Sequence, residues 1–277
     1  MTITAAQLDN FLSTLRDEEK SAATLERYGR DIRCFAQWLG DAPLTHDAVL
    51  NYKAHLTQHY AADSVNSILA ALNRFLSLLD REDCRVRRLR VQYQAYAPEE
   101  REITAQEYAA LVRTARETGR TRLALVLETI CATGIRISEL PAITAEAARR
   151  GVAVVRCKGK SRRVILPSRL QNKLLRYIKQ RRIACGSVFV TRTGTPLDRS
   201  NIWREMKALC RAAGVSDKKV FPHNFRHLFA RTFYRLDKDL AKLADLLGHN
   251  SINTTRIYIR STGAEHRRFL ERMHLVL

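Results

Sequence analysis

The stretch Phe221–Tyr258 constrains the fold most strongly, because the helix ends within it can be predicted from local chemistry. Pro222 suits the first turn of a helix, where a missing N–H costs no hydrogen bond. Asp239 and Ser251 can each cap the start of a helix, and Gly248 is typical of the left-handed residue that ends one. The stretch therefore predicts three consecutive helices, of which the last is short and follows a tight turn.

Three residues that can bind or move a proton share one face of the first of these helices. His223, Arg226 and His227 are spaced i, i+3 and i+4, and His249 directly follows the turn before the third helix, which carries Tyr258. Apolar side chains form a separate stripe at Phe225, Leu228, Phe229, Thr232, Phe233 and Leu236. The grouping of imidazoles, a guanidinium and a phenol is compatible with a phosphate-binding pocket.

These residues lie in recognisable motifs. HNFRH followed by LGHNSINTTRIY resembles the second half of the tyrosine recombinase (phage integrase) family pattern, and ATGIRISEL at residues 132–140 resembles the first half. The resemblance covers most of residues 100–262 in the right order, which is more specific than a single motif. It implies a mainly α fold with a small β-sheet (α+β), in which a helical, SAM-like core-binding domain precedes an integrase-type catalytic domain. The plan is most like compact Xer-type recombinases.

The charge balance agrees with a nucleic-acid partner. The chain has 48 Lys+Arg against 28 Asp+Glu, a net charge of +20 and a pI near 10.2. No apolar run approaches the roughly 18–20 residues that span a bilayer, and the N-terminus has no secretory signal pattern, so we expect a cytoplasmic protein with no membrane partner. The cysteines form no CxxC pair, and Asn224 replaces the Glu of an HExxH motif, so no metal site is expected.

The periodicity divides the chain into two domains and a connector. Residues 1–80 predict a core-DNA-binding domain of four helices. Residues 81–101 are basic and contain Pro98, which predicts a linker that either crosses a DNA backbone or is a solvated connector. Residues 102–277 form the expected catalytic domain, with a capping box at Thr104–Glu107.

Within the second domain, β-rich runs at 152–157 and 163–166 predict a hairpin, and Val188–Val190 predicts a short strand. Further helices are expected near 168–182 and 199–213. The apolar C-terminal tail, residues 264–277, needs a surface to cover it, which is either its own domain or, as the resemblance implies, a neighbouring protomer.

The resemblance assigns roles to the polar motif residues. Arg136 and Arg226 match the arginines that bind the phosphate to be cut, and Tyr258, nine residues after His249, matches the nucleophile. His223 matches the general base, and His249 matches a position that hydrogen-bonds the phosphate.

Other motif residues receive less definite roles. Lys158 or Lys160 is expected to protonate the leaving 5′-oxygen, and the family register favours Lys158. His227 and Glu139 also match motif positions, but we expect them to support the fold or orient neighbours. The resemblance implies a 3′-phosphotyrosyl intermediate that conserves bond energy, so neither ATP nor a metal cofactor is expected.

The function implied is site-specific DNA recombination. Four protomers would pair two double-stranded DNA sites and exchange strands through a Holliday junction, and some of the four could be copies of a partner recombinase. Two alternatives remain open, a type IB topoisomerase-like relaxing enzyme and a non-catalytic DNA-binding accessory protein. Base readout depends on a few side chains that the sequence does not place in a groove, so the target site and the biological role stay open.

Overall fold

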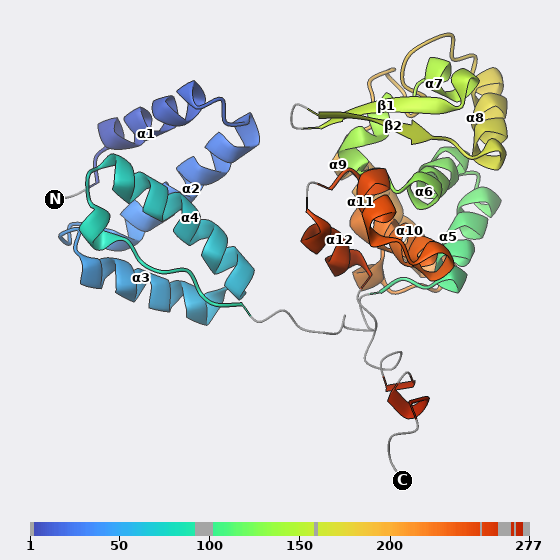
Figure 1. Cartoon of the computed structure of the whole chain (residues 1–277). Coiled ribbons are helices and arrows are strands. Elements are labelled where there is room, and N and C mark those ends of the chain that lie inside the picture. Colours follow the sequence, from blue (N-terminus) through green and yellow to red (C-terminus); the bar gives the residue numbers. More distant parts are fainter. Residues whose placement is uncertain are drawn as a thin grey trace. The chain divides into compact units, whose positions relative to one another are not determined.

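The computed structural model describes residues 3–91, 102–157, 160–249, 251–259, 267–268 and 270–273. The chain divides into two compact units, Met1–Tyr93 and Gln94–Leu277 (Figure 1). Most of the described chain is helical and the described sheet has two strands, which confirms the predicted fold class. None of the described helices is long and apolar enough to cross a membrane.

The N-terminal unit contains the four helices expected from the sequence. They are α1 (Ala5–Asp17), α2 (Ala22–Leu39), α3 (His46–His59) and α4 (Ala62–Leu78). Their apolar stripes meet in one core, where Phe11, Phe35 and Phe75 are at most 1% exposed. The edge-on contact between Phe11 and Phe75, with ring centroids 5.3 Å apart, joins the first helix to the last.

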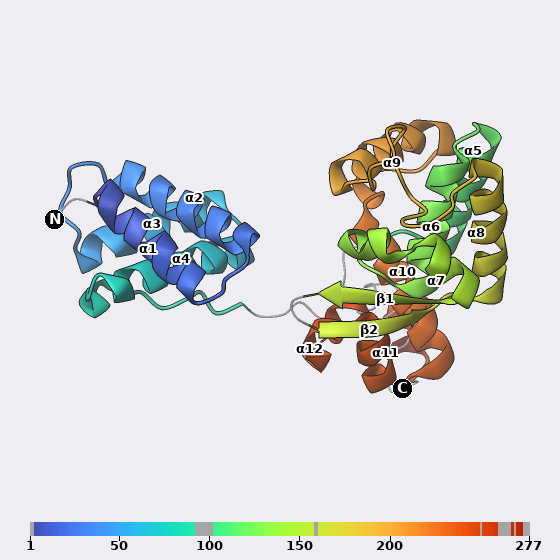
Figure 2. The same cartoon turned by 90° about the horizontal axis from the view of Figure 1, so that it is seen from above.

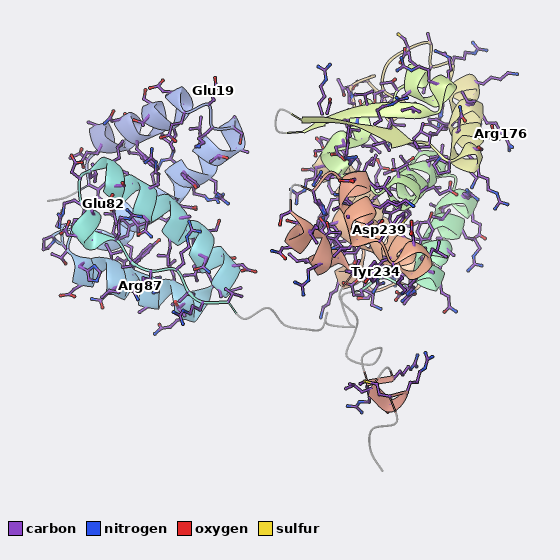
Figure 3. All side chains as sticks on the ribbon, in the orientation of Figure 1. Glu19, Glu82, Arg87, Arg176, Tyr234 and Asp239 are labelled. Atoms are coloured by element: carbon purple, nitrogen blue, oxygen red, sulfur yellow. The ribbon has the colours of Figure 1, made fainter. Side chains whose placement is uncertain are left out.

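The first part of the predicted linker is folded onto this unit. The 3₁₀ helix η1 (Glu82–Cys84) and Val86 contribute to the core, and the Asn73 side chain exchanges two hydrogen bonds with the backbone of Val86, at 2.8 and 3.1 Å. Figure 3 labels Glu82 and Arg87 on this segment. Residues 92–101 of the linker lie outside the described residues. Asn66 likewise exchanges two hydrogen bonds with the backbone of Leu89, at 3.0 and 2.7 Å.

The second unit is built around α6 (Thr121–Thr133), which is buried along most of its length. It packs against α5 (Ala105–Glu117), α8 (Ser168–Arg181), α9 (Arg199–Ala213) and α10 (Pro222–Asp237). The 3₁₀ helices η3 (Ile137–Ala142) and η4 (Asp217–Lys219) and the short helix α7 (Ala145–Arg150) complete this part. The outer face of α8, where Arg176 is labelled, is solvent-exposed (Figure 3).

The predicted hairpin is present, but the predicted strand is not. Strands β1 (Val152–Cys157) and β2 (Lys160–Ile165) pair antiparallel, with Val152 opposite Ile165 (Figure 2). The expectation of a strand at Val188–Val190 is wrong, because Val190 makes an isolated bridge with Pro196 and Ser187 another with Thr144. A proline has no N–H to extend a ladder, which explains why the pairing stops there.

The last helices are α11 (Leu240–Leu247) and α12 (Ile252–Tyr258), and they lie beside α10 in both views (Figures 1 and 2). Their ends follow the predicted chemistry. Asp239, labelled in Figure 3, caps α11, Gly248 ends it with φ of +65°, and Ser251 caps α12. Most of the predicted C-terminal tail 264–277 lies outside the described residues; of the described part, Leu270 and Met273 are 53% and 44% exposed.

Candidate active site

The first arginine of the site is fixed by the turn that ends α6. Gly134 has φ of +64°, and a Cβ there would lie 2.5 Å from the ring of Phe229 and 2.9 Å from Leu247, so the turn packs directly on α10 and α11. Arg136 follows at the start of η3, where its backbone N–H donates to Glu139 Oε2 at 2.8 Å. The tight turn therefore sets the direction of the Arg136 side chain.

A buried carboxylate holds two guanidinium groups together. Glu139 is 4% exposed, its Oε1 accepts from Arg136 Nη1 at 3.2 Å, and its Oε2 accepts from Arg162 Nη2 at 2.7 Å. Arg162 comes from β2, and a Cβ on Gly248 would lie 2.5 Å from its Nε, so the hairpin contacts the turn after α11. Glu139 thus ties the hairpin to the arginine after α6.

The second arginine lies inside the unit. Arg226 on α10 is 1% exposed; it donates to the carbonyls of Gly134 and, at 2.8 Å, Leu247. Its Nε has no hydrogen-bond partner among the described residues. Burial lowers the pKa of Arg226 to about 10, and the nearby charge of Arg136 acts in the same direction, while its interaction with Tyr258 opposes the shift. Arg136, whose side chain is 30% exposed, also reaches the carbonyl of Leu247, so two like charges are held close together, an arrangement that an anion would stabilise.

Tyr258 lies among these polar groups. It is 6% exposed, and its ring centroid lies 5.0 Å from that of His223, 4.5 Å from that of His227 and 4.9 Å from that of His249. The Cζ atom of Arg226 lies 5.6 Å from the ring centroid of Tyr258. The phenol of α12 is therefore enclosed by imidazole and guanidinium groups from α10 and from the turn after α11.

Two of the imidazoles are neutral at neutral pH. Part of His223 reaches solvent, but burial of the rest, with the electrostatic effects of the neighbouring His227, Arg226 and Arg136, lowers its pKa to about 4. Burial and the charges of Arg226 and Arg136 likewise lower the pKa of His249 to about 4. Both rings can therefore accept a proton, and binding of an anion to the arginines would make that transfer easier.

The structure brings together five of the six residues that the sequence nominated: Arg136, His223, Arg226, His249 and Tyr258. The sixth, Lys158, lies outside the described residues, and of Lys160 only the backbone is described, at the start of β2. The identity of the lysine that serves as general acid therefore stays a prediction.

Three side chains of the site were not found by sequence reasoning. Arg162 contacts Glu139, Thr255 accepts a hydrogen bond from His249, and Glu102 contacts His227. None lies among the motif residues to which we assigned roles, although Thr255 lies inside the LGHNSINTTRIY segment. Their contacts with these partners are seen only in the folded structure. Among the described residues, no group of three or more His, Cys, Asp or Glu side chains is placed to hold a metal ion.

The comparisons with known proteins agree on one family. Residues 101–265 match the phage integrase family, and residues 8–83 match its N-terminal SAM-like domain. The tyrosine recombinase XerD of Halalkalibacterium halodurans is 29% identical over 275 residues, which cover 91% of each chain. The tyrosine recombinase XerC of Roseiflexus castenholzii is 31% identical over 91% of this chain and 88% of its own.

A solved structure supports the same fold. A lambda integrase tetramer bound to a Holliday junction aligns with a TM-score of 0.74 at 19% identity, over 91% of this chain and 76% of the other.

Proposed function

Because the chain belongs to the phage integrase family and is a tyrosine recombinase, we propose that it recombines DNA at a specific site with Tyr258 as the nucleophile. The observation that carries this assignment is the enclosure of the Tyr258 ring by Arg226 and three imidazoles, beside Arg136. A phenol needs a clamped target and a proton acceptor to react at neutral pH, and this arrangement offers both.

In the proposed reaction, Arg136 and Arg226 bind the non-bridging oxygens of one DNA phosphate. Each such preorganised donor is worth roughly 3–4 kcal/mol in well-studied sites. The Tyr258 hydroxyl loses its proton to His223 and attacks phosphorus, which forms a 3′-phosphotyrosyl bond as the bond to the 5′-oxygen breaks. Lys158, or Lys160 in its place, protonates the departing 5′-oxygen. Once the anion has entered, Nε2 of His249 takes up a proton and donates a hydrogen bond to the phosphate.

The covalent intermediate conserves the energy of the phosphodiester, so a second 5′-hydroxyl can reverse the step on another strand. We propose that four protomers carry out this exchange between two double-stranded sites through a Holliday junction. The lambda integrase tetramer supports this arrangement by analogy. The net charge of +20 supplies phosphate contacts whose affinity falls as salt rises. The C-terminal tail 264–277 is proposed to dock on a neighbouring protomer.

Capture of a covalent protein–DNA adduct tests the assignment. Nicked duplexes with one randomised half-site are incubated with wild-type protein, and duplexes recovered in SDS-resistant adducts define a substrate. Tyr258→Phe is expected to bind the selected duplex with unchanged affinity and to form no adduct. Tyr234→Phe, a change on α10 outside the imidazole cluster, serves as the control and should form the adduct normally.

The other outcomes separate the alternatives. An adduct of undiminished yield from Tyr258→Phe would remove this residue from its role. Relaxation of arbitrary plasmids without a specific site would instead favour a topoisomerase-like enzyme. Tight DNA binding by the wild-type protein without any adduct would favour a non-catalytic accessory protein.

A further inference from the structure

A second carboxylate contacts the imidazole cluster from outside the family motifs. Glu102 precedes α5, and its Oε1 lies 3.4 Å from Nδ1 of His227, while its Oε2 lies 3.3 Å from Nη1 of Arg231. The three side chains are only 13%, 16% and 11% exposed. Arg231 is held in turn by the carbonyl of Ile103, to which it donates at 2.9 Å. The carboxylate is therefore fixed in place and largely removed from water.

Glu102 is ionised in this environment. Burial raises its pKa, but hydrogen bonding to His227 and the charge of Arg231 outweigh that effect, and the net pKa is lowered. An ionised carboxylate only accepts hydrogen bonds, so the proton facing it must lie on Nδ1 of His227. In neutral His227 the other nitrogen, Nε2, is then an acceptor. One tautomer is selected, as in the carboxylate–histidine pairs of hydrolases.

His227 transmits this constraint to the nucleophile. Of the three imidazoles around Tyr258, its ring centroid is the nearest at 4.5 Å, and it lies 4.9 Å from that of His223. The charge of Glu102 also raises the pKa of His223, against the effects of burial, His227, Arg226 and Arg136. Glu139, the other carboxylate of the site, is already paired with Arg136 and Arg162.

We propose that Glu102 is a positioning residue that acts through His227: it fixes the ring against Tyr258 and supplies the negative charge that balances a protonated His223. The second role, balancing the charge of a protonated His223, rests on the proposed function. When the O–H bond of Tyr258 breaks, the proton moves to a nitrogen of His223 and creates an imidazolium. The charges of Arg136 and Arg226 repel this imidazolium, whereas Glu102, which contacts the neighbouring His227, attracts it. The carboxylate therefore stabilises the state in which the phenolate attacks phosphorus.

Single-turnover adduct formation on the selected duplex tests the charge. Glu102→Gln keeps the shape of the side chain and removes its charge. We expect the rate of adduct formation to fall by up to about tenfold. Because a carboxylate raises the pKa of a nearby imidazole, its loss should also move the acid limb of the pH–rate profile to lower pH, by about 0.5 unit or more. Glu102→Asp, which keeps the charge, should return the acid limb to its wild-type pH.

The matched control is Glu107→Gln. It removes a carboxylate that pairs with Lys219 at 2.8 Å, in the first turn of α5, and that has no contact with the histidines. It is expected to alter stability without moving the acid limb. An acid limb in Glu102→Gln that coincides with that of the wild type would overturn the charge role, because a purely structural defect lowers the plateau alone.

A readout without DNA tests the positioning. Nitrogen-15 NMR of the DNA-free protein should show His227 with its proton on Nδ1 in the wild type, and a changed tautomer population in Glu102→Gln. A wild-type His227 with its proton on Nε2 would overturn the proposal. If the wild type forms no adduct at all, the proposed function fails, and the tautomer measurement still decides the contact between Glu102 and His227.

Discussion

Nη2 of Arg226 lies 2.8 Å from Nε2 of His249, and this contact decides the tautomer of the imidazole. A guanidinium has only donors, so Nε2 must be the acceptor and the proton must lie on Nδ1. Nδ1 in turn lies 2.8 Å from Oγ1 of Thr255, to which it donates. A chain of hydrogen bonds therefore runs from the buried arginine of α10, through the turn after α11, to the helix that carries Tyr258.

Removing the end of this chain should misplace the nucleophile. Thr255 is fully buried, so Thr255→Val keeps the shape but leaves the Nδ1–H of His249 without its acceptor. An unsatisfied buried donor costs about 1–3 kcal/mol, and we expect a similar loss of stability in thermal or urea unfolding. Adduct formation should slow roughly tenfold or more while DNA affinity is kept. Thr254→Val, an exposed change on the same helix, is the control; equal rates in both variants would contradict the prediction.

The histidines predict how stability depends on pH. Folding lowers the pKa values of His223 and His249 from 6.5 to about 4, so the unfolded chain binds more protons between these values. The free energy of unfolding should therefore fall as the pH drops from about 6.5 to 4. Because His223 is partly exposed, we expect the pair to contribute about 1–3 kcal/mol rather than the full shift.

Unfolding at a series of pH values measures this contribution. Carboxylates titrate in the same window, so the relevant quantity is the difference between the wild type and the double variant His223→Gln/His249→Gln. The variant should have the flatter pH dependence. Identical slopes for the two proteins would show that the imidazoles are not held neutral by the fold.

Helix ends could be predicted from the sequence more successfully than contacts between distant side chains, because helix capping depends on residues only a few positions apart. Thr104 and Glu107 form the expected capping box, with hydrogen bonds of 2.8 and 3.1 Å. The partners Glu102 and His227 are far apart in the chain, and no local pattern connects them. The motifs suggested that Arg136 and Arg226 lie close together, and both donate to the carbonyl of Leu247. The buried bridge from Glu139 to Arg162 could not be predicted, because it depends on where the hairpin lies. The helix α7 was missed because six residues carry little periodicity.

The ion pairs of Glu139 with Arg136 and Arg162 predict the effect of removing the Glu139 charge. Glu139→Gln leaves Arg136 and Arg162 without their shared buried anion, and breaking a buried ion pair costs about 3–5 kcal/mol. We expect a large drop in stability and, at temperatures where the variant is folded, strongly reduced adduct formation. Glu128→Gln is the matched control, since Glu128 pairs with Arg116 at 2.6 Å and with Lys173 at 2.5 Å outside the site. It should lose stability and keep the rate of the folded protein. Equal specific rates in the two variants would argue against a role of Glu139 in holding Arg136.

Two glycines separate backbone strain from the contact between the hairpin and the turn after α11. Gly248 and Gly214 both end helices in the left-handed region, with φ of +65° and +64°. Alanine at either position costs about 1 kcal/mol for that conformation. At Gly214 a Cβ meets nothing within 4 Å, whereas at Gly248 it would lie 2.5 Å from Nε of Arg162. We therefore expect Gly248→Ala to lose more stability than Gly214→Ala and, unlike it, to slow adduct formation, because Arg162 must move away from Glu139. If both variants formed the adduct at the wild-type rate, the position of Arg162 would not matter for the reaction.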